Sequence, residues 1–196
     1  MVKKSLDTYK KKRDFDQTPE PKKKANTSYD NPIFVIQKHN ASNEHYDFRL
    51  EVEGVLKSWA VPKGPSTNPS DKRLAIATED HPLKYADFEG VIPEDNYGAG
   101  EVIIWDKGTY ENNTKKDGES ISMKTAYDKG HISIWLEGEK LNGGYSLVDI
   151  DRGDDQWLLI KEDDKAADRR RKPTKTEPKS IVSDQTIENL KDNDND

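Results

Sequence analysis

The sequence contains no cysteine, which excludes disulfide bonds, thiolate metal sites and cysteine nucleophiles. It also contains no apolar run long enough for a signal peptide or a membrane-spanning helix. Apolar residues are scarce at 31%, whereas charged residues make up 36% of the 196 residues. Because the sequence has neither cysteine nor a long apolar run, we expect a cytoplasmic protein without membrane contact. A core can form only if the few apolar residues are gathered in one part of the chain.

The apolar residues are indeed gathered between Phe34 and Ile160, a stretch that holds three of the four Phe and all four Trp. Its length predicts a single domain between two polar flanks. We expect residues 1–8 to be a flexible N-terminus and 9–162 to be the folded domain, with 9–33 as an arm. We expect residues 163–196 to be a disordered, charged tail.

The net charge of −6 is spread unevenly over the chain. Residues 1–33 carry a net charge of +4 and residues 163–196 a net charge of −1, so the middle, 34–162, carries −9. An acidic body repels phosphate at long range. Any role with nucleic acid must therefore rest on a small, locally cationic site and not on a broad basic face.

The middle of the chain is predicted to form strands, because short runs of β-branched and aromatic residues alternate with turn signals such as Glu53-Gly54 and Asn142-Gly143-Gly144. The expected strands are 34–39, 45–53, 55–61, 73–79, 100–107, 131–136, 145–151 and 156–161. Within this middle stretch, helical turns are expected only near Tyr85 and Thr125, and in the tail only residues 181–190 could form a short helix. We therefore predict a mainly β fold, an antiparallel closed β-barrel with short flanking helical turns and a flexible C-terminal tail.

Polar residues share one face in three of these expected strands. Strand 45–53 has His45, Asp47 and Arg49 on one face, and strand 34–39 has Gln37 and His39. In 73–79 the corresponding face is expected to hold Arg73, Ala75, Ala77 and Glu79, with Leu74 and Ile76 behind it. If the three faces converge, they line a polar cleft or the barrel lumen. A solvated outer face is the alternative for each strand taken alone.

His39 and His45 flank the short loop 40–44, and Asp47 follows on the same face as His45. A tight turn would bring the three side chains together. Two imidazoles and a carboxylate suit Mn²⁺, Zn²⁺ or Fe²⁺. Ordinary surface histidines are the alternative explanation of this spacing.

Cations surround this group in the sequence. Arg49 follows Asp47 on the same face, Arg73 and Glu79 occupy a parallel row, and Lys63 lies in the rigid corner Pro62-Lys63-Gly64-Pro65. A metal ion beside several fixed cations is typical of a phosphate site. His81 has two interpretations, since it either contacts a phosphoryl oxygen or leaving group or only ends a strand before Pro82. His131 lies far along the chain and is expected to be structural or exposed.

Several long motifs resemble one known family. They span residues 37–51, 56–66, 73–85, 88–93, 97–106 and 108–111, with Tyr9, 13–15 and 18–21 near the N-terminus. In all of them the sequence resembles the 3′-phosphoesterase domain of bacterial and archaeal DNA ligase D. The resemblance covers about residues 9–161 and leaves the tail unexplained.

The resemblance implies a barrel-like fold and an Mn²⁺-dependent enzyme, with Co²⁺ or Zn²⁺ as possible substitutes. Such an enzyme removes a 3′-terminal ribonucleoside and then the 3′ phosphate from nucleic acid, leaving a 3′ hydroxyl for a ligase. By motif match, the metal ligands are His39, His45 and Asp47. Arg49 and His81 grip the phosphate, with Lys63 and Arg73 near it. The remaining matched positions are Gln37, Glu79 and Tyr85 in the pocket and Arg13, Asp14 and Glu20 in an arm over the site.

No polymerase or ligase motif follows in this sequence, so it resembles a stand-alone version whose partners would be a separate ligase, polymerase or Ku-like protein. Three other functions stay open. They are a nucleic-acid-end-binding module that has lost catalysis, a small-molecule phosphodiesterase, and a metal-dependent oxygenase or isomerase in a β-barrel.

Overall fold

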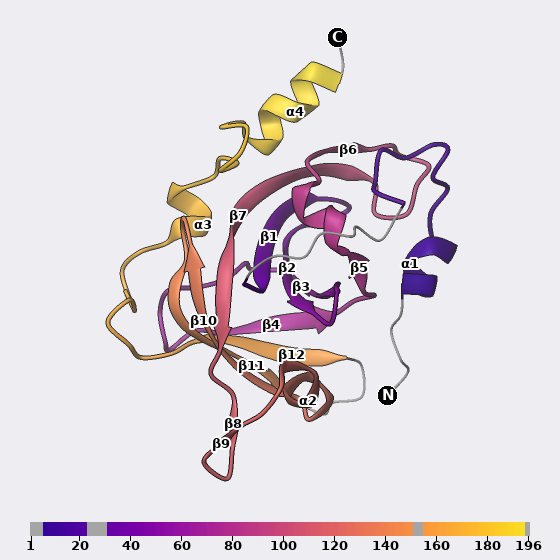
Figure 1. Cartoon of the computed structure of the whole chain (residues 1–196). Coiled ribbons are helices and arrows are strands. Elements are labelled where there is room, and N and C mark those ends of the chain that lie inside the picture. Colours follow the sequence, from indigo (N-terminus) through magenta and orange to yellow (C-terminus); the bar gives the residue numbers. More distant parts are fainter. Residues whose placement is uncertain (1–5, 23–30, 151–154, 195–196) are drawn as a thin grey trace.

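Eight antiparallel strands close into a barrel in the computed structural model, which describes residues 6–22, 31–150 and 155–194 (Figure 1). In spatial order they are β1 (Ile33–Asn40), β2 (Glu44–Val52), β3 (Val55–Val61), β4 (Lys72–Ala77), β12 (Gln156–Lys161), β11 (Asn142–Asp149), β10 (His131–Gly138) and β7 (Gly100–Asn112). Each strand pairs with the next in this order, and β7 pairs with β1 to close the ring. The predicted antiparallel closed barrel is confirmed.

Smaller elements decorate the barrel. The two expected helical turns correspond to the 3-10 helix η1 (Leu83–Asp87) and to α2 (Met123–Asp128). Four short strands were not predicted from the sequence: β5 (His81–Pro82), β6 (Gly90–Ile92), β8 (Lys115–Lys116) and β9 (Glu119–Ser120). Gly143 and Gly144, expected in a turn, lie inside β11, and Asp151 lies outside the described residues.

The hairpin between β2 and β3 sets the register on which the site depends. Glu53 and Gly54 both have positive φ angles, of 50° and 76°. Two such residues form the primed turn that matches the twist of paired strands. Arg49 consequently lies opposite Ser58, and Asp47 lies opposite Ala60.

Two apolar clusters lie on opposite sides of the barrel wall. The first fills the barrel and includes the buried Phe48, Trp59 and Trp157. The second lies outside the barrel, where Tyr9 and Tyr85 pack with residues of β1, β3 and β7. Tyr9 belongs to α1 (Leu6–Lys11), so the arm forms part of an outer layer over β1 and β3. The polar face of β2 points into this outer layer and not into the lumen.

The expected orientation of strand 73–79 was wrong. Ala75 and Ala77 point into the barrel core, whereas Leu74 and Ile76 are 39% and 37% exposed on the outside. The alternating pattern of polar and small residues concealed this, because alanine fits either face. Glu79 still reaches the outer layer because it lies beyond the end of β4.

The segment after β12 differs from the disordered tail that we expected. Residues 163–194 run along the barrel and include α3 (Pro173–Thr176) and α4 (Ile187–Asp194) (Figure 1). Its anchors include the buried Pro173, Ser180 and Ile187. Charged residues dominate the composition and hide these few anchors. In the N-terminal flank, residues 1–5 of the expected flexible segment and 23–30 of the arm lie outside the described residues.

Among the helices of the described residues, none combines the length and the apolar character needed to cross a membrane.

Candidate active site

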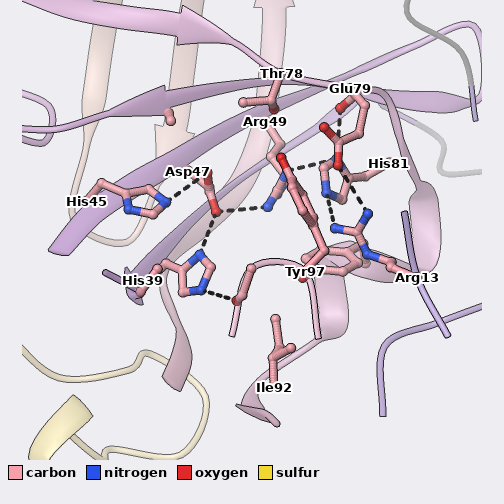
Figure 2. Close-up of a pocket in the computed structure, with 14 residues that line it drawn as sticks. Arg13, His39, His45, Asp47, Arg49, Thr78, Glu79, His81, Ile92 and Tyr97 are labelled. Atoms are coloured by element: carbon pink, nitrogen blue, oxygen red, sulfur yellow. Dashed lines mark hydrogen bonds and ion pairs between the residues drawn. The ribbon is translucent and has the colours of Figure 1, made fainter. Parts of the chain in front are cut away.

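The polar face of β1 and β2 opens into a cavity of about 330 Å³ beneath the N-terminal arm (Figure 2). Strands β1 and β2 supply its floor, the turn after β4 supplies one wall and the arm supplies another. The lining residues are Arg13, His39, Ala41, His45, Asp47, Arg49, Ala60, Thr78, Glu79, His81, Tyr85, Ile92, Tyr97 and Gly98.

His39, His45 and Asp47 converge at one end of this cavity. Their ligand atoms all lie within 4.8 Å of one another. The Nδ1 atom of His39 lies 3.5 Å from one oxygen of Asp47, and the Nε2 atom of His45 lies 3.6 Å from the other. The cause is local, because the β1–β2 register sets His39 directly opposite His45. The tight turn predicted from the sequence therefore does bring the three together.

The far ring nitrogen of each histidine contacts a backbone carbonyl. His39 Nε2 lies 2.8 Å from the carbonyl oxygen of Gly98, and His45 Nδ1 lies 2.9 Å from that of Asn43. If these nitrogens donate, the other ring nitrogen of each histidine presents a lone pair toward Asp47. Such second contacts orient ligand histidines and fix their tautomers in metal sites. The residues present therefore fit a divalent metal ion of the first transition row, and two nitrogens with a carboxylate suit Mn²⁺, Co²⁺ or Zn²⁺.

Arg49 connects the metal-ligand group to the rest of the cavity. Its Nη2 donates to Asp47 over 3.0 Å and its Nε donates to Gln37 over 2.7 Å. Gln37 is itself fixed, because its amide donates to the carbonyls of Tyr85 and Phe88. The guanidinium therefore has one defined orientation, with its central carbon 4.8 Å from the Tyr85 ring centre.

Electrostatics keep Asp47 ionised. Burial alone would raise its pKa, but the neighbouring Arg49 charge holds the pKa well below its ordinary value. The carboxylate is then charged at neutral pH, as metal binding requires.

His81 lies at the opposite end of the cavity from the metal-ligand group and is almost completely buried. Its Nδ1 lies 3.0 Å from Arg49 Nη1 and 2.9 Å from the carbonyl oxygen of Glu79, while Nε2 lies 3.4 Å from Arg13 Nη2. Burial and the charges of the two arginines hold the pKa of His81 well below its ordinary value. The ring is therefore neutral at pH 7 and can donate or accept a hydrogen bond.

The arm closes the cavity through Arg13. This side chain donates to Glu20 over 2.8 Å and to Glu79 over 3.1 Å, and it lies 4.0 Å from the Tyr9 ring centre. The hydroxyl of Tyr85 donates to the same Glu20 over 2.9 Å. Two arginines from different parts of the chain thus flank His81, and each is paired with a carboxylate.

Five sequence-predicted positions do not line the cavity. Gln37 and Glu20 lie behind it, where they accept from the lining residues Arg49 and Arg13. The other three are Lys63, Asp14 and Arg73. Lys63 is exposed beyond the end of β3, and Asp14 is exposed in the arm. Arg73 donates to Asp71 over 2.9 Å at the far end of β4. None of the three lines the cavity.

The structure also adds residues that the sequence analysis did not select. Tyr97 lines the cavity and is 50% exposed, and Lys12 donates to both its hydroxyl and Glu79 over 3.1 Å. Gly98 holds His39. In the sequence, Tyr97 and Gly98 stand out only as part of the matched motif 97–106. No pattern in these two residues indicates the contact with His39, which depends on Gly98 having a positive φ angle of 78°.

This fold and this cavity define a β-barrel protein with a candidate metal-binding and phosphate-binding site. The family model described as the DNA Ligase D 3′-phosphoesterase domain matches residues 37–149. The chain belongs to that family.

The similar proteins found by sequence comparison are LigD proteins. Over 190 residues the chain is 48% identical to the multifunctional non-homologous end joining protein LigD of Pseudomonas aeruginosa, covering 94% of this chain and 22% of that protein. Over 154 residues it is 47% identical to the multifunctional non-homologous end joining DNA repair protein LigD of Mycobacterium tuberculosis, covering 78% and 19%. The chain thus spans about a fifth of the length of these relatives.

Proposed function

We propose that this chain is a metal-dependent phosphoesterase that heals the 3′ ends of DNA during end joining. It would first remove a 3′-terminal ribonucleoside and then the 3′ phosphate, leaving a 3′ hydroxyl that a separate ligase can seal. Polymerase and Ku-like proteins are the other expected partners. One observation carries the proposal. A group of two histidines and an aspartate shares a 330 Å³ cavity with two oriented arginines and a neutral histidine.

His39, His45 and Asp47 would hold the metal, for which Mn²⁺ is the preferred candidate. A bound divalent ion polarises a phosphoryl oxygen and stabilises the negative charge that develops there. Arg49 is suited to a second oxygen, because its contacts with Gln37 and Asp47 fix the guanidinium before substrate arrives. Arg13 lies on the other side of His81 and is suited to a third oxygen.

The chemistry of the two steps defines what His81 has to do. In the first step a water oxygen bonds to phosphorus while the bond to the 5′ oxygen of the terminal ribonucleoside breaks. In the second step the bond to the 3′ oxygen breaks. Each leaving oxygen needs a proton, and His81 is positioned to orient or relay one because it is neutral and lies between the two arginines. Tyr85 stays protonated, because burial raises its pKa well above the ordinary value.

The test uses a 5′-labelled primer–template that ends in one 3′ ribonucleotide, incubated with the protein and Mn²⁺. We expect stepwise conversion to a 3′ phosphate and then to a 3′ hydroxyl. EDTA and the variant His45→Ala should both abolish it. His131→Ala is the matched control, because this histidine is exposed on β10. An unchanged primer with every divalent metal would contradict the proposal and leave the non-catalytic end-binding module in its place.

A further inference from the structure

Basic side chains gather beside the loop between β3 and β4, away from the cavity. Two come from this loop and its junction with β4, and three come from the tail segment after β12. All five are exposed. We call this group the basic patch, and it consists of Lys63, Lys72, Arg169, Arg170 and Lys172. In the part of the chain that the structure describes, only Arg169 has a carboxylate partner, Asp163, at the surface and 3.8 Å away.

The tail is fixed against the loop by buried contacts. The hydroxyl of Thr67 donates to the carbonyls of Asp168 and Arg171, and the amide of Asp168 donates back to Thr67. Thr67 is 2% exposed, so this junction is shielded from water. Further along, a Cβ atom on Gly64 would lie 2.7 Å from Thr174. These contacts fix the backbone that carries the basic side chains, so the backbone needs no ordering when a ligand binds.

Two acids lie beside the patch, and both already accept hydrogen bonds from other groups. Asp71 accepts from Ser66 and from Arg73, and Asp168 accepts from the amides of Arg170 and Arg171. The side chains of Arg170, Lys63 and Lys72 are left facing solvent. The acidic total charge predicted a small, locally cationic site and no broad basic face. The structure forms such a local patch from two distant parts of the chain, the β3–β4 loop and the tail.

The patch lies along a continuous outer surface from the cavity. Ala60 and Thr78 line the cavity, and Ala60 lies opposite Ile76 on β4. From Thr78 the outward row of β4 runs through Ile76 and Leu74 to Lys72. At a rise of about 3.3 Å per residue, Lys72 lies roughly 13 Å from Ile76 and roughly 20 Å from Thr78. Successive nucleotides in a duplex rise about 3.4 Å, so this corresponds to about four to six nucleotides.

We propose that the basic patch binds the sugar–phosphate backbone of the DNA duplex about four to six nucleotides from the 3′ end that occupies the cavity. The inference rests on the proposed function for the position of the 3′ end. It assigns a role to the tail segment 169–172, because charge complementarity to phosphate is the recognition that exposed Arg and Lys side chains provide.

The first experiment measures binding without turnover. Fluorescence anisotropy follows a labelled 12-base-pair duplex that already ends in a 3′ hydroxyl, over a series of salt concentrations. The test variant is Lys72→Ala/Arg169→Ala/Arg170→Ala. The control, Lys115→Ala/Lys116→Ala/Lys129→Ala, removes the same charge at exposed positions, two of them in the β8–β9 hairpin that projects from the barrel (Figure 1).

We expect the test variant to bind at least tenfold more weakly than the wild type at low salt. Its slope of log affinity against log salt should be shallower by about 0.9 for each phosphate group that the variant no longer neutralises. The control should keep the wild-type slope. Equal affinities and slopes for the two variants would overturn the proposal. A patch that serves another macromolecule would give that same result.

The second experiment compares long and short substrates. We expect the test variant to lose about tenfold in kcat/KM on the 12-base-pair duplex with a 3′ phosphate. A dinucleotide with a 3′ phosphate is too short to reach the patch, so its kcat/KM should stay within twofold of wild type. An equal loss on both substrates would overturn the proposal. If the wild type hydrolyses neither substrate, the proposed function fails and the binding experiment alone decides the inference.

Discussion

Arg49 and Asp47 share a hydrogen bond of 3.0 Å in which a candidate phosphate-binding guanidinium contacts a candidate metal ligand. The same guanidinium lies 3.0 Å from His81 at the other end of the cavity. The alternation of β2 places Arg49 and Asp47 two residues apart on one face, and both side chains are buried there. Substitution of Arg49 should therefore separate metal binding from phosphate chemistry.

We predict that Arg49→Lys lowers kcat by about 100-fold while the Mn²⁺ affinity changes less than about threefold. Lysine keeps the positive charge near Asp47, but its single ammonium cannot reach Gln37, Asp47 and His81 at once. Loss of one oriented donor costs about 10²–10³ in rate. Steady-state kinetics and Mn²⁺ titration measure the two quantities. Arg171→Lys, in the tail, is the matched control, and an unchanged kcat in Arg49→Lys would contradict the assignment.

His81 gives a prediction for the pH dependence of stability. Its pKa is about 6.5 in the unfolded chain and well below that in the folded protein, because burial and two arginine charges oppose protonation. Below pH 6.5 the unfolded state binds a proton that the folded state does not. The free energy of unfolding therefore falls as the pH drops, by at most about 1.4 kcal/mol per pH unit from this group. Above pH 6.5 this contribution is constant.

The variant His81→Asn cannot titrate at this position, so its stability should fall less steeply between pH 7 and pH 5.5. Denaturant unfolding in the presence of a chelator measures the difference and keeps metal binding out of it. His131→Asn removes an exposed histidine and should follow the wild-type profile. Parallel profiles for wild type and His81→Asn would show that His81 is not held neutral.

Much of the barrel could be predicted from the sequence because its strands alternate and its turns carry strong local signals. Glu53-Gly54 is such a signal, and the observed turn has the two positive φ angles that it predicts. In strand β4, the alternation of residues did not predict which face points into the barrel. Alanine fits both a core and a polar face, so the sequence could not show that Ala75 and Ala77 face inward.

The candidate metal group could be predicted because His39, His45 and Asp47 depend on one hairpin. The rest of the cavity depends on contacts between distant segments. Lys12 reaches Tyr97 across 85 residues of sequence, and no local pattern indicates such a pair. Lys63 and Arg73 were predicted near the phosphate but do not line the cavity. A motif match gives residue types but not the face on which each side chain lies.

A pair of glycine substitutions tests how closely the start of β7 packs against the metal-ligand strand β1. A Cβ atom on Gly100 would lie 1.9 Å from the carbonyl oxygen of Asn40, next to His39, whereas one on Gly118 would meet nothing within 4 Å. Both glycines have φ angles in the left-handed region, of 131° and 86°. Alanine at Gly118 should cost only the backbone strain, about 1–2 kcal/mol.

Gly100→Ala should cost about 1–3 kcal/mol more than Gly118→Ala, because the β1–β7 pairing has to shift. It should also weaken Mn²⁺ binding, since the shift moves the strand end that carries His39. Thermal unfolding and Mn²⁺ titration of both variants measure these effects. Equal stabilities would mean that Gly100 tolerates a side chain and that the close approach does not constrain the site.

The packed tail gives the last prediction, since a disordered tail could be removed without loss of stability. The Trp105 indole donates to the carbonyl of Glu177 over 2.7 Å, and the Tyr46 hydroxyl donates to that of Thr174 over 3.2 Å. Ile187 is also buried against the barrel. Removing residues 163–196 should therefore cost about 3 kcal/mol, because apolar burial and hydrogen bonds disappear with the tail.

For a domain of this size that cost corresponds to a fall in Tm of roughly 10 °C. Calorimetry of the truncated chain measures it. A chain shortened only by residues 195–196 is the control and should keep the Tm of the full chain. An unchanged Tm after removal of 163–196 would support the original prediction of a disordered tail. It would also remove the fixed backbone on which the basic patch depends, because Arg169 and Arg170 would then have no defined position beside Lys72.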